Sequence, residues 1–422
     1  MTASTRRPRI SLVVPTRDRA FTLAQTLRTC VAQDYPELEI VVHDNASGPD
    51  TAAAVARFDD PRLRYFRSET RLSMRANWEA ALARTTGDYI VFIGDDDLVT
   101  LGGISRLAGL IAETGAEAIK WTSVNYIWPN RSTTEAGYLI LKHSKLFWDY
   151  TVYGGGAILD AMFEGRLRMS MRTFHVYHGC ISRRIIDDVK ASTRQYFCYH
   201  IPDVYTAFAN VFVTDRILFV RHPITSFGHS ASSNAMSFYQ DATGAAEAGG
   251  ETPYAKFVSE IDADREAPWP YNPFIKAMSY HGLVSLHIAN EMFATGRRIN
   301  VEAWLGHALA ETVADPIYLA EAHKAPVIYA FDRMLKERLP PAPEIAVSAH
   351  GKRIRAHGTR RRLNKLDVPT ALDGEDNSFT AARVLDRLTD TGYRIAPRGP
   401  LSTARHAWHW FRLQARAGEY LR

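Results

Sequence analysis

Residues 87–98 read Gly-Asp-Tyr-Ile-Val-Phe-Ile-Gly-Asp-Asp-Asp-Leu, an apolar run that ends in three consecutive carboxylates. The apolar part, Tyr89–Ile93, has the length and content of a strand that is buried on both faces. Three comparable runs precede it, at Ile10–Val14, Leu38–Val42 and Leu63–Phe66. Segments with helical spacing separate these runs, at 20–33, 51–58 and 74–83. This alternation predicts an α/β fold with a mainly parallel sheet and helices on both of its faces.

The carboxyl ends of parallel strands meet along one edge of a sheet, and ligands bind beyond that edge. Three of the predicted strands deliver polar residues there. These residues are Pro15, Thr16, Arg17 and Asp18, then Asp44, Asn45 and Ser47, then Asp95, Asp96 and Asp97. The sequence contains neither a glycine-rich dinucleotide fingerprint nor a P-loop, so it supports neither of these phosphate-binding devices.

The acidic triplet 95–97 predicts a divalent metal. Adjacent carboxylates repel one another unless a cation lies beside them. Their hard oxygen ligands suit Mg²⁺ or Mn²⁺, which take one or two carboxylates together with substrate phosphates. Such a metal would neutralise a diphosphate leaving group. An acidic triplet on an exposed loop is usually just solvated, but a position directly after a buried strand, at the same edge as Asp44, favours the metal.

With these features the chain resembles the inverting glycosyltransferases of family 2, which have the GT-A fold, a Rossmann-like α/β arrangement. Four segments carry the likeness, in the order and spacing of the family: Ser11–Thr16, Leu38–Ser47, Met74–Trp78 and Gly87–Leu98. The likeness is specific over the first quarter of the chain and extends more weakly to about His229. It implies the GT-A fold and transfer of a sugar from a nucleotide-sugar donor.

The resemblance also implies roles for individual residues. Those expected to contact the donor nucleotide are Pro15, Thr16, Arg17, Asp44, Asn45, Ser47, Arg75, Asn77, Asp95 and Asp96. Within this set, residues 15–17 match the loop that wraps the base and ribose. Asp44 matches the carboxylate that accepts the ring N–H of a pyrimidine, typically uracil, and Asn45 and Ser47 would brace its loop.

Residues 95–97 match the DXD element of the family, which binds ribose and metal. The chain departs from the common Asp-x-Asp-Asp pattern, because the first Asp falls on Gly94 in one alignment. The metal ligand is therefore open among the three carboxylates, with Asp97 as the first candidate and Asp95 as the second. His229 lies in the donor-rich segment 228–234 and is a further candidate for a metal or phosphate contact. The alternative for that segment is an ordinary solvent-exposed loop.

An inverting transfer needs a general base that takes the proton of the acceptor hydroxyl. Asp203 is the first candidate, because Pro202 begins a predicted helix whose first N–H groups favour an anion. Asp203 also matches the acidic base position of the family. A simple helix cap is the alternative for Asp203. Asp187 and Asp188 form the second candidate for the base.

The chain has 422 residues, which is too long for one small core and predicts a large catalytic domain with added elements. We expect a glycosyltransferase domain over 1–235, divided into a nucleotide-binding half (1–100) and an acceptor-binding half (101–235). Helical spacing predicts a helical region over 236–343. A basic tail with short helices is expected over 344–422.

The formal net charge is +5, and basic residues gather in the predicted tail. They are Lys352, Arg353, Arg355, Arg360, Arg361, Arg362 and Lys365. This tail is expected either to contact a membrane surface or another polyanion, or to be simply solvated. Residues 406–413 mix aromatic and basic side chains, which predicts a helix that lies on a membrane or packs on the body.

No apolar run reaches the length of a membrane-spanning helix, and no signal-peptide core follows the N-terminus. The three cysteines lack metal-site spacing, so we expect reduced thiols. These features predict a cytoplasmic protein, with peripheral contact at the inner membrane face as a second expectation. Oligomeric state is not predicted.

The predicted function is a hexosyltransferase that moves a sugar from a nucleotide-sugar donor, expected to be a UDP-sugar, onto an acceptor hydroxyl with inversion. Mn²⁺ or Mg²⁺ assists, and the acceptor is a glycan, a lipid-linked sugar or another polymer of bacterial polysaccharide or glycoconjugate synthesis. One alternative is glycosylation of a nucleic acid or other polymer guided by the basic tail. Another is a nucleotidyltransferase, although its basic, glycine-rich triphosphate loop is missing. A binding module without catalysis leaves the acidic triplet unexplained.

Overall fold

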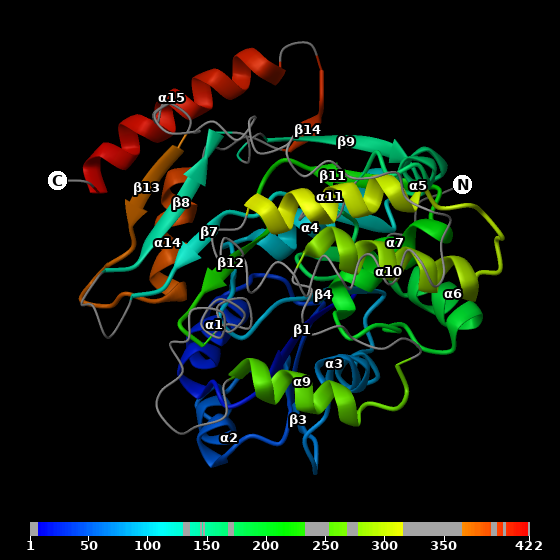
Figure 1. Cartoon of the computed structure of the whole chain (residues 1–422). Coiled ribbons are helices and arrows are strands. Elements are labelled where there is room, and N and C mark those ends of the chain that lie inside the picture. Colours follow the sequence, from blue (N-terminus) through cyan, green and yellow to red (C-terminus); the bar gives the residue numbers. More distant parts are fainter. Residues whose placement is uncertain are drawn as a thin grey trace.

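The computed structural model describes residues 7–129, 136–143, 146, 148–167, 173–232, 253–267, 277–314, 365–389, 395–399 and 402–420. The described helices and strands form a large sheet with helices on both faces and a smaller sheet beside it (Figure 1). The predicted boundaries at 235/236 and 343/344 fall outside the described residues, so the division into these domains stays a proposal.

The four strands predicted from the sequence form the parallel part of the large sheet. They are β1 (Ile10–Thr16), β2 (Leu38–Asp44), β3 (Leu63–Arg67) and β4 (Tyr89–Phe92), in the order β4-β1-β2-β3. The predicted helices between them are α1 (Ala20–Val31), α2 (Pro49–Val55) and α3 (Met74–Leu82). Every residue of β2 is buried, because helices cover both faces of the sheet. The predicted α/β class is confirmed.

Beyond β4 the large sheet becomes mixed. It continues through β10 (Gly179–Ser182), β6 (Ala118–Trp121), β11 (Arg216–Val220), β9 (Asp149–Gly154) and β14 (Ala396–Pro397). β10 runs antiparallel to both β4 and β6, and β9 runs antiparallel to β11. Within the large sheet, parallel pairs of the described strands still outnumber antiparallel pairs, which agrees with the predicted mainly parallel sheet.

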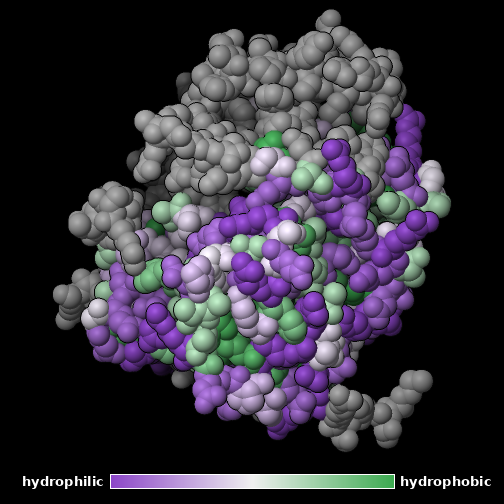
Figure 2. Space-filling view, turned by 90° about the horizontal axis from the view of Figure 1, so that it is seen from below, coloured by the Kyte–Doolittle hydropathy of each residue, from purple (hydrophilic) through white to green (hydrophobic). Residues whose placement is uncertain are grey.

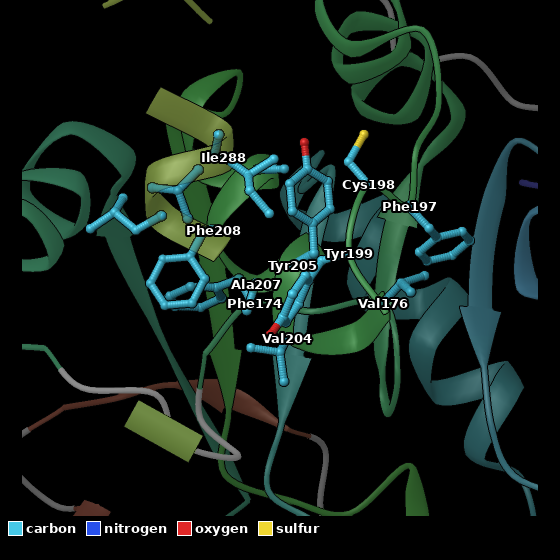
Figure 3. Packing of buried hydrophobic residues seen from close by; sticks show 14 of the residues in the cluster. Phe174, Val176, Phe197, Cys198, Tyr199, Val204, Tyr205, Ala207, Phe208 and Ile288 are labelled. Carbon is cyan, nitrogen blue, oxygen red and sulfur yellow. The ribbon is translucent and has the colours of Figure 1, made fainter. Parts of the chain in front are cut away.

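Two apolar layers sandwich the large sheet, and β1 contributes to both. Val13 faces one cluster, whereas Leu12 and Val14 face the other. The Val13 layer is covered by α3 and by α5 (Gly155–Phe163), α6 (Arg183–Thr193), α7 (Pro202–Phe212), α10 (Met278–Met292) and α11 (Val301–Ala314). The other layer is covered by α1, α2 and α4 (Gly103–Thr114). Figure 3 shows side chains of the first cluster from α7 packed beside Ile288 of α10.

α10 and α11 lie within the segment 236–343 and confirm its predicted helical character as far as residue 314. The remainder of that predicted helical segment lies outside the described residues. α9 (Pro253–Ala263) lies beside α3, on the lower side of the molecule in Figure 1. Seen from below, hydrophilic residues surround a smaller hydrophobic area on that side (Figure 2).

The smaller sheet has five strands, in the order β13-β8-β7-β12-β5. They are β13 (Lys365–Pro369), β8 (Tyr138–Lys142), β7 (Asn125–Ile127), β12 (Thr225–His229) and β5 (Leu98–Val99). α14 (Ser378–Thr389) and α15 (Ser402–Tyr420) pack on it through one apolar cluster that runs from Leu98 to Trp410 and Leu413. From Lys365 onward, part of the predicted basic tail therefore folds against this sheet. Its basic residues 352–362 lie outside the described part.

None of the helices within the described residues combines the length and the apolar content that a membrane crossing requires.

Two side chains of α15, two positions apart in the sequence, test which face of this helix packs on the small sheet. Leu413 is 1% exposed in the apolar cluster, whereas Phe411 is 69% exposed. Leu413→Ala should lower the free energy of unfolding by about 2–5 kcal/mol, because it leaves a cavity. Phe411→Ala, the matched control, should change it by less than about 0.5 kcal/mol. Denaturant unfolding of both variants measures this difference, and equal effects would contradict the described packing of α15.

Candidate active site

The candidate site lies where the strand order of the large sheet reverses. β2 and β3 extend from one side of β1, and β4 lies on its other side, so the carboxyl ends of β1 and β4 are the place where open α/β sheets bind their ligands. Thr16, at the end of β1, donates a hydrogen bond of 2.7 Å to Asp95 Oδ2. Arg19 donates one of 3.0 Å to the other carboxylate oxygen of Asp95. Both oxygens of Asp95 therefore bind groups from the first strand and the loop that follows it.

Side chains from two other elements hold the backbone of the acidic triplet. Thr26 of α1 donates from one hydroxyl to Asp95 O at 3.1 Å and to Asp97 O at 2.7 Å. Trp128, just after β7, donates its indole N–H to Asp96 O at 2.8 Å. These bonds fix the turn between β4 and β5, so the three carboxylates keep fixed directions.

Asp97 is completely surrounded by hydrogen-bond donors. Its Oδ2 accepts from the N–H of Gly94 at 2.5 Å and from Tyr177 Oη at 2.7 Å, and it lies 3.0 Å from His178 Nε2. Its Oδ1 accepts from the N–H of Gly228 at 2.8 Å. Burial alone would raise the pKa of Asp97, but the charge and hydrogen bond of His178, with the other donors, hold it below its ordinary value.

Gly228 lets β12 approach the triplet closely. A Cβ at this position would lie 1.6 Å from Asp96 O, so no larger residue fits without moving the backbone. Two residues later, Ser230 donates from its hydroxyl to Asp96 Oδ2 at 2.6 Å. His229 lies between these two contacts, and its carbonyl accepts from Trp128 N–H at 3.2 Å. The structure thus brings the His229 segment to the triplet, and its metal or phosphate role stays a prediction.

Asp96 differs electrostatically from its neighbour. Burial and the charges of Asp97 and Asp95 raise its pKa to about 7, and Arg19 offsets only part of this. Asp97 stays ionised because hydrogen-bond donors surround it. The repulsion between two adjacent buried charges therefore raises the pKa of Asp96 rather than that of Asp97. A divalent cation beside Asp96 would hold that carboxylate ionised.

The described residues contain no group of three or more His, Cys, Asp or Glu side chains arranged to hold a metal. Mg²⁺ and Mn²⁺ need only one or two carboxylates when substrate phosphates complete the shell. Asp96 fits this role. Ser230 donates a hydrogen bond to its Oδ2, and a nearby cation would stabilise the ionised form of this buried carboxylate. Asp95 and Asp97 each have both oxygens engaged by protein donors. The geometry therefore favours Asp96 over the first candidate, Asp97, whose metal role stays a prediction.

The loop after β2 is braced as a unit. Asp44 accepts from the N–H of Ser47 at 3.0 Å and from Tyr65 Oη at 2.6 Å. Asn45 exchanges two hydrogen bonds, each 2.8 Å, with the backbone of Leu72. The hydroxyl of Ser47 accepts from the N–H of Asp18. The structure therefore joins the loops after β1 and β2, as expected for one binding edge.

Three residues predicted to contact the donor have protein partners instead. Arg75 donates to both oxygens of Asp264, at 2.8 and 2.7 Å, just after α9. Arg17 forms an ion pair with Glu260 of α9. Asn77 Oδ1 lies 2.8 Å from His43 Nδ1 of β2, in a buried contact between α3 and the sheet. Pro15 is half-buried near the end of β1. The donor roles of all four residues stay predictions.

Asp203 lies in the first turn of α7, as predicted. Burial raises its pKa to about 6, against the opposing effects of Lys120 and of the backbone N–H groups of Val204 and Asp203 itself. Lys120 is 1% exposed and donates 2.8 Å hydrogen bonds to the carbonyls of Tyr177 and His178. Burial, Asp97, Asp96 and Asp203 together raise the pKa of the Tyr177 phenol. Asp203 and the triplet therefore act on the same tyrosine.

The second candidate for the base lies elsewhere. Asp187 is exposed on α6, and Asp188 forms a surface ion pair of 2.6 Å with Arg184. Among the described residues, neither carboxylate contacts the triplet or Tyr177, so Asp203 is the better candidate.

Four site residues were missed by the sequence reasoning: Arg19, Lys120, Tyr177 and Gly228. A glycine inside a strand, such as Gly228, signals a close backbone approach and could have been noticed. A lysine inside an apolar strand, such as Lys120, is a second such signal, because buried lysines need partners. Nothing in the local pattern around Tyr177 indicates that it bridges to Asp97.

The comparisons with known proteins agree with this geometry. Residues 11–163 match the family model described as Glycosyl transferase family 2.

The matched segment contains β1 to β4 and the acidic triplet, which are the parts on which the resemblance was based. The chain is 32% identical over 103 residues to the GalNAc(5)-diNAcBac-PP-undecaprenol β-1,3-glucosyltransferase of Campylobacter jejuni, covering 24% of this chain and 33% of that protein. It is 25% identical over 89 residues to the Escherichia coli glucosyltransferase WfgD, named for UDP-Glc and α-D-GlcNAc-diphosphoundecaprenol, covering 21% and 35%. The chain thus spans about a third of the length of these curated relatives.

Two solved structures align with most of this chain at low sequence identity. TarS 1–349 of S. aureus, in complex with UDP-GlcNAc, has a TM-score of 0.43 at 13% identity, covering 78% of this chain and 92% of that one. The mannosyltransferase PcManGT of Pyrobaculum calidifontis, in complex with GDP-Man and Mn²⁺, has a TM-score of 0.38 at 18% identity, covering 78% and 81%.

Stability at two pH values separates the roles of the two neighbouring aspartates. Asp97→Asn should lower the free energy of unfolding by about 2–4 kcal/mol at neutral pH, because it removes an ionised acceptor from buried donors. Asp96→Asn should leave it unchanged or raise it, because the ionised Asp96 is penalised by burial. In wild type, the free energy of unfolding falls as pH rises from the ordinary carboxyl range toward 7, because the raised pKa of Asp96 makes its ionisation unfavourable in the folded state. Between about pH 5 and pH 8, Asp96→Asn should therefore lose less stability than wild type. Equal behaviour of the two variants in denaturant unfolding would contradict the assignment.

Proposed function

We propose that the protein is a metal-assisted, inverting glycosyltransferase that uses a nucleotide-sugar donor, with a UDP-sugar as the first choice. The observation that carries this proposal is the shared position of Tyr177, whose hydroxyl donates to Asp97. The pKa of Tyr177 is raised by burial, by the charges of Asp97 and Asp96 and, to the smallest extent, by that of Asp203. The edge expected to hold a nucleoside diphosphate and the carboxylate expected to act as base thus lie near one side chain.

The donor binds along the edge formed by the ends of β1, β2 and β4. Asp44 has hydrogen-bond capacity left beyond Ser47 and Tyr65, because each carboxylate oxygen offers two lone pairs. It accepts the N–H of the base, and the loops around Thr16 and Ser47 enclose the ribose. Arg19, held on Asp95, adds a positive charge near the diphosphate.

Asp96 holds the divalent metal together with the phosphates of the donor, with His229 as a further candidate ligand. When bound, Mn²⁺ or Mg²⁺ supplies positive charge that stabilises the leaving diphosphate. Asp97 is held in place by its contacts with Gly94, Tyr177, His178 and Gly228. The turn that carries Asp96 therefore keeps its position when a charged ligand binds.

Asp203 takes the proton of the acceptor hydroxyl as its oxygen attacks the anomeric carbon. The new C–O bond forms as the bond from that carbon to the diphosphate oxygen breaks, and the electron pair leaves with the nucleoside diphosphate. With a pKa of about 6, Asp203 is mostly ionised at neutral pH and still basic enough to accept a proton. Attack on the face opposite the leaving group inverts the configuration.

The acceptor class proposed first is a lipid-linked sugar of bacterial polysaccharide or glycoconjugate synthesis. Two relatives over the matched segment are named as glucosyltransferases that act on sugars linked to diphosphoundecaprenol. Soluble glycans and other polymers are the remaining acceptors to be compared with it.

The activity is tested with a panel of UDP-, GDP- and dTDP-sugars in the presence of Mn²⁺, with release of the nucleoside diphosphate as the readout. We expect UDP release that increases with acceptor and is abolished by a chelator. Absence of diphosphate release from every donor, with glycan and lipid-linked acceptors supplied, would contradict the proposal. Release of pyrophosphate from a nucleoside triphosphate and a sugar phosphate would indicate a nucleotidyltransferase instead.

The base is tested by Asp203→Asn against the matched surface variant Asp187→Asn. Asp203→Asn should lower kcat by about 10²–10⁴-fold while donor binding stays near that of wild type, because only the proton acceptor is lost. Asp187→Asn should retain full activity. In wild type, kcat/KM should fall about tenfold per pH unit below about pH 6, as Asp203 becomes protonated. Normal turnover by Asp203→Asn would place the base on another residue.

A further inference from the structure

The C-terminal helix α15 has two apolar stripes, one buried and one exposed. The covered face consists of residues at helical spacing, namely His406, His409, Trp410, Leu413 and Ala417, all of them buried. The opposite face carries a second stripe at helical spacing, namely Ala404, Trp408, Phe411 and Ala415, all of them exposed. A helix that only packs on a body needs one apolar face, so the exposed stripe gives α15 an additional apolar surface that a ligand can contact.

The exposure of this second stripe is large. Trp408 is 46% exposed and Phe411 is 69% exposed, the highest fraction among the large hydrophobic side chains described. In Figure 1, α15 runs along the upper edge of the molecule, on the outer side of the small sheet. The stripe therefore faces away from the body over the length of the helix.

Arginines accompany the stripe. Arg405 is exposed, and Arg412 and Arg416 are half-buried on the same helix, whereas Glu419 is the single acidic residue in the sequence of α15. The guanidinium carbon of Arg412 lies 4.7 Å from the centre of the Trp408 ring. Aromatic side chains on one face with arginines around them are the pattern of a helix that lies in the interface of an anionic membrane. The amphipathic tryptophan is suited to the headgroup level, and arginine stems reach from there to lipid phosphates.

α15 is also connected to the candidate active site through the small sheet. The apolar cluster that contains Trp410 and Leu413 also contains Leu98, which follows the acidic triplet, and Trp128, which donates to Asp96 O. One edge strand of the small sheet, β5, begins at Leu98, and the other edge strand, β13, packs against α15. Binding of α15 to a membrane would thus attach the small sheet, which contacts the acidic triplet, to the membrane surface.

We propose that the outer stripe of α15, with Trp408 and Phe411 at its centre and Arg405 and Arg412 beside it, docks the protein on the surface of a phospholipid membrane with anionic headgroups. The helix lies in the plane of the interface. Both aromatic side chains enter the boundary between headgroups and acyl chains, and the arginines contact the lipid phosphates. This interaction needs neither donor nor acceptor, so it does not depend on the proposed transfer.

The test uses the full-length protein and co-sedimentation with vesicles of phosphatidylglycerol and phosphatidylcholine, compared with vesicles of phosphatidylcholine alone. We expect preferential binding to the anionic vesicles, weaker at high salt because the charge contribution is screened. The double variant Trp408→Ala with Phe411→Ala should lower the partition coefficient about tenfold or more, because the buried apolar area of the interface is lost. Arg405→Gln with Arg412→Gln should lower binding to anionic vesicles only.

The matched control is Met278→Ala on α10, which removes a 40% exposed apolar side chain from another surface and should bind vesicles as wild type does. Thermal unfolding of every variant verifies that the fold is retained. Three results would overturn the proposal. The first is vesicle binding that the double aromatic variant leaves unchanged, and the second is no binding of wild type to anionic vesicles. The third is binding of a partner of another class through the same aromatic side chains. This would be seen as a dimer in light scattering, or as binding to duplex DNA without binding to vesicles, that the aromatic substitutions abolish.

Discussion

The arrangement of the site depends on one buried carboxylate. Asp97 is 1% exposed, and such a charge costs several kcal/mol unless donors surround it. The donors come from three separate parts of the chain: the turn at Gly94, the segment with Tyr177 and His178, and strand β12 at Gly228. Satisfying this one charge brings the turn after β4, the entry to β10 and the small sheet together.

That constraint has consequences for the chemistry. Because Asp97 remains ionised, its neighbour Asp96 carries the repulsion, and the pKa of Asp96 rises to about 7. The carboxylate that gains most from a cation is therefore the one beside the fully bonded aspartate, and the fixed turn holds it in place. Lys120 fixes the carbonyls of Tyr177 and His178 from the other side, which positions the same segment relative to Asp203.

The sequence was sufficient for the first hundred residues because fully buried parallel strands are recognisable by their apolar runs, and strand ends by the polar residues after them. β1 to β4, the meeting of Thr16 with Asp95, and the position of Asp203 at a helix start could all be predicted. The direction of β10 could not, because apolar content does not encode whether a strand runs parallel. The contacts of Arg75 and Arg17 with α9 are long-range pairings that no local pattern contains.

We propose that the edge formed by β1, β2 and β4 binds a nucleoside diphosphate together with a divalent metal at the acidic triplet. The most direct measurement is a crystal structure of the protein with UDP and Mn²⁺, with the metal located by its anomalous scattering. The account predicts an anomalous peak about 2.0–2.4 Å from an oxygen of Asp96 and in contact with the phosphates of UDP, whose base lies at Asp44. A nucleotide bound elsewhere, or Mn²⁺ away from residues 95–97, would contradict it.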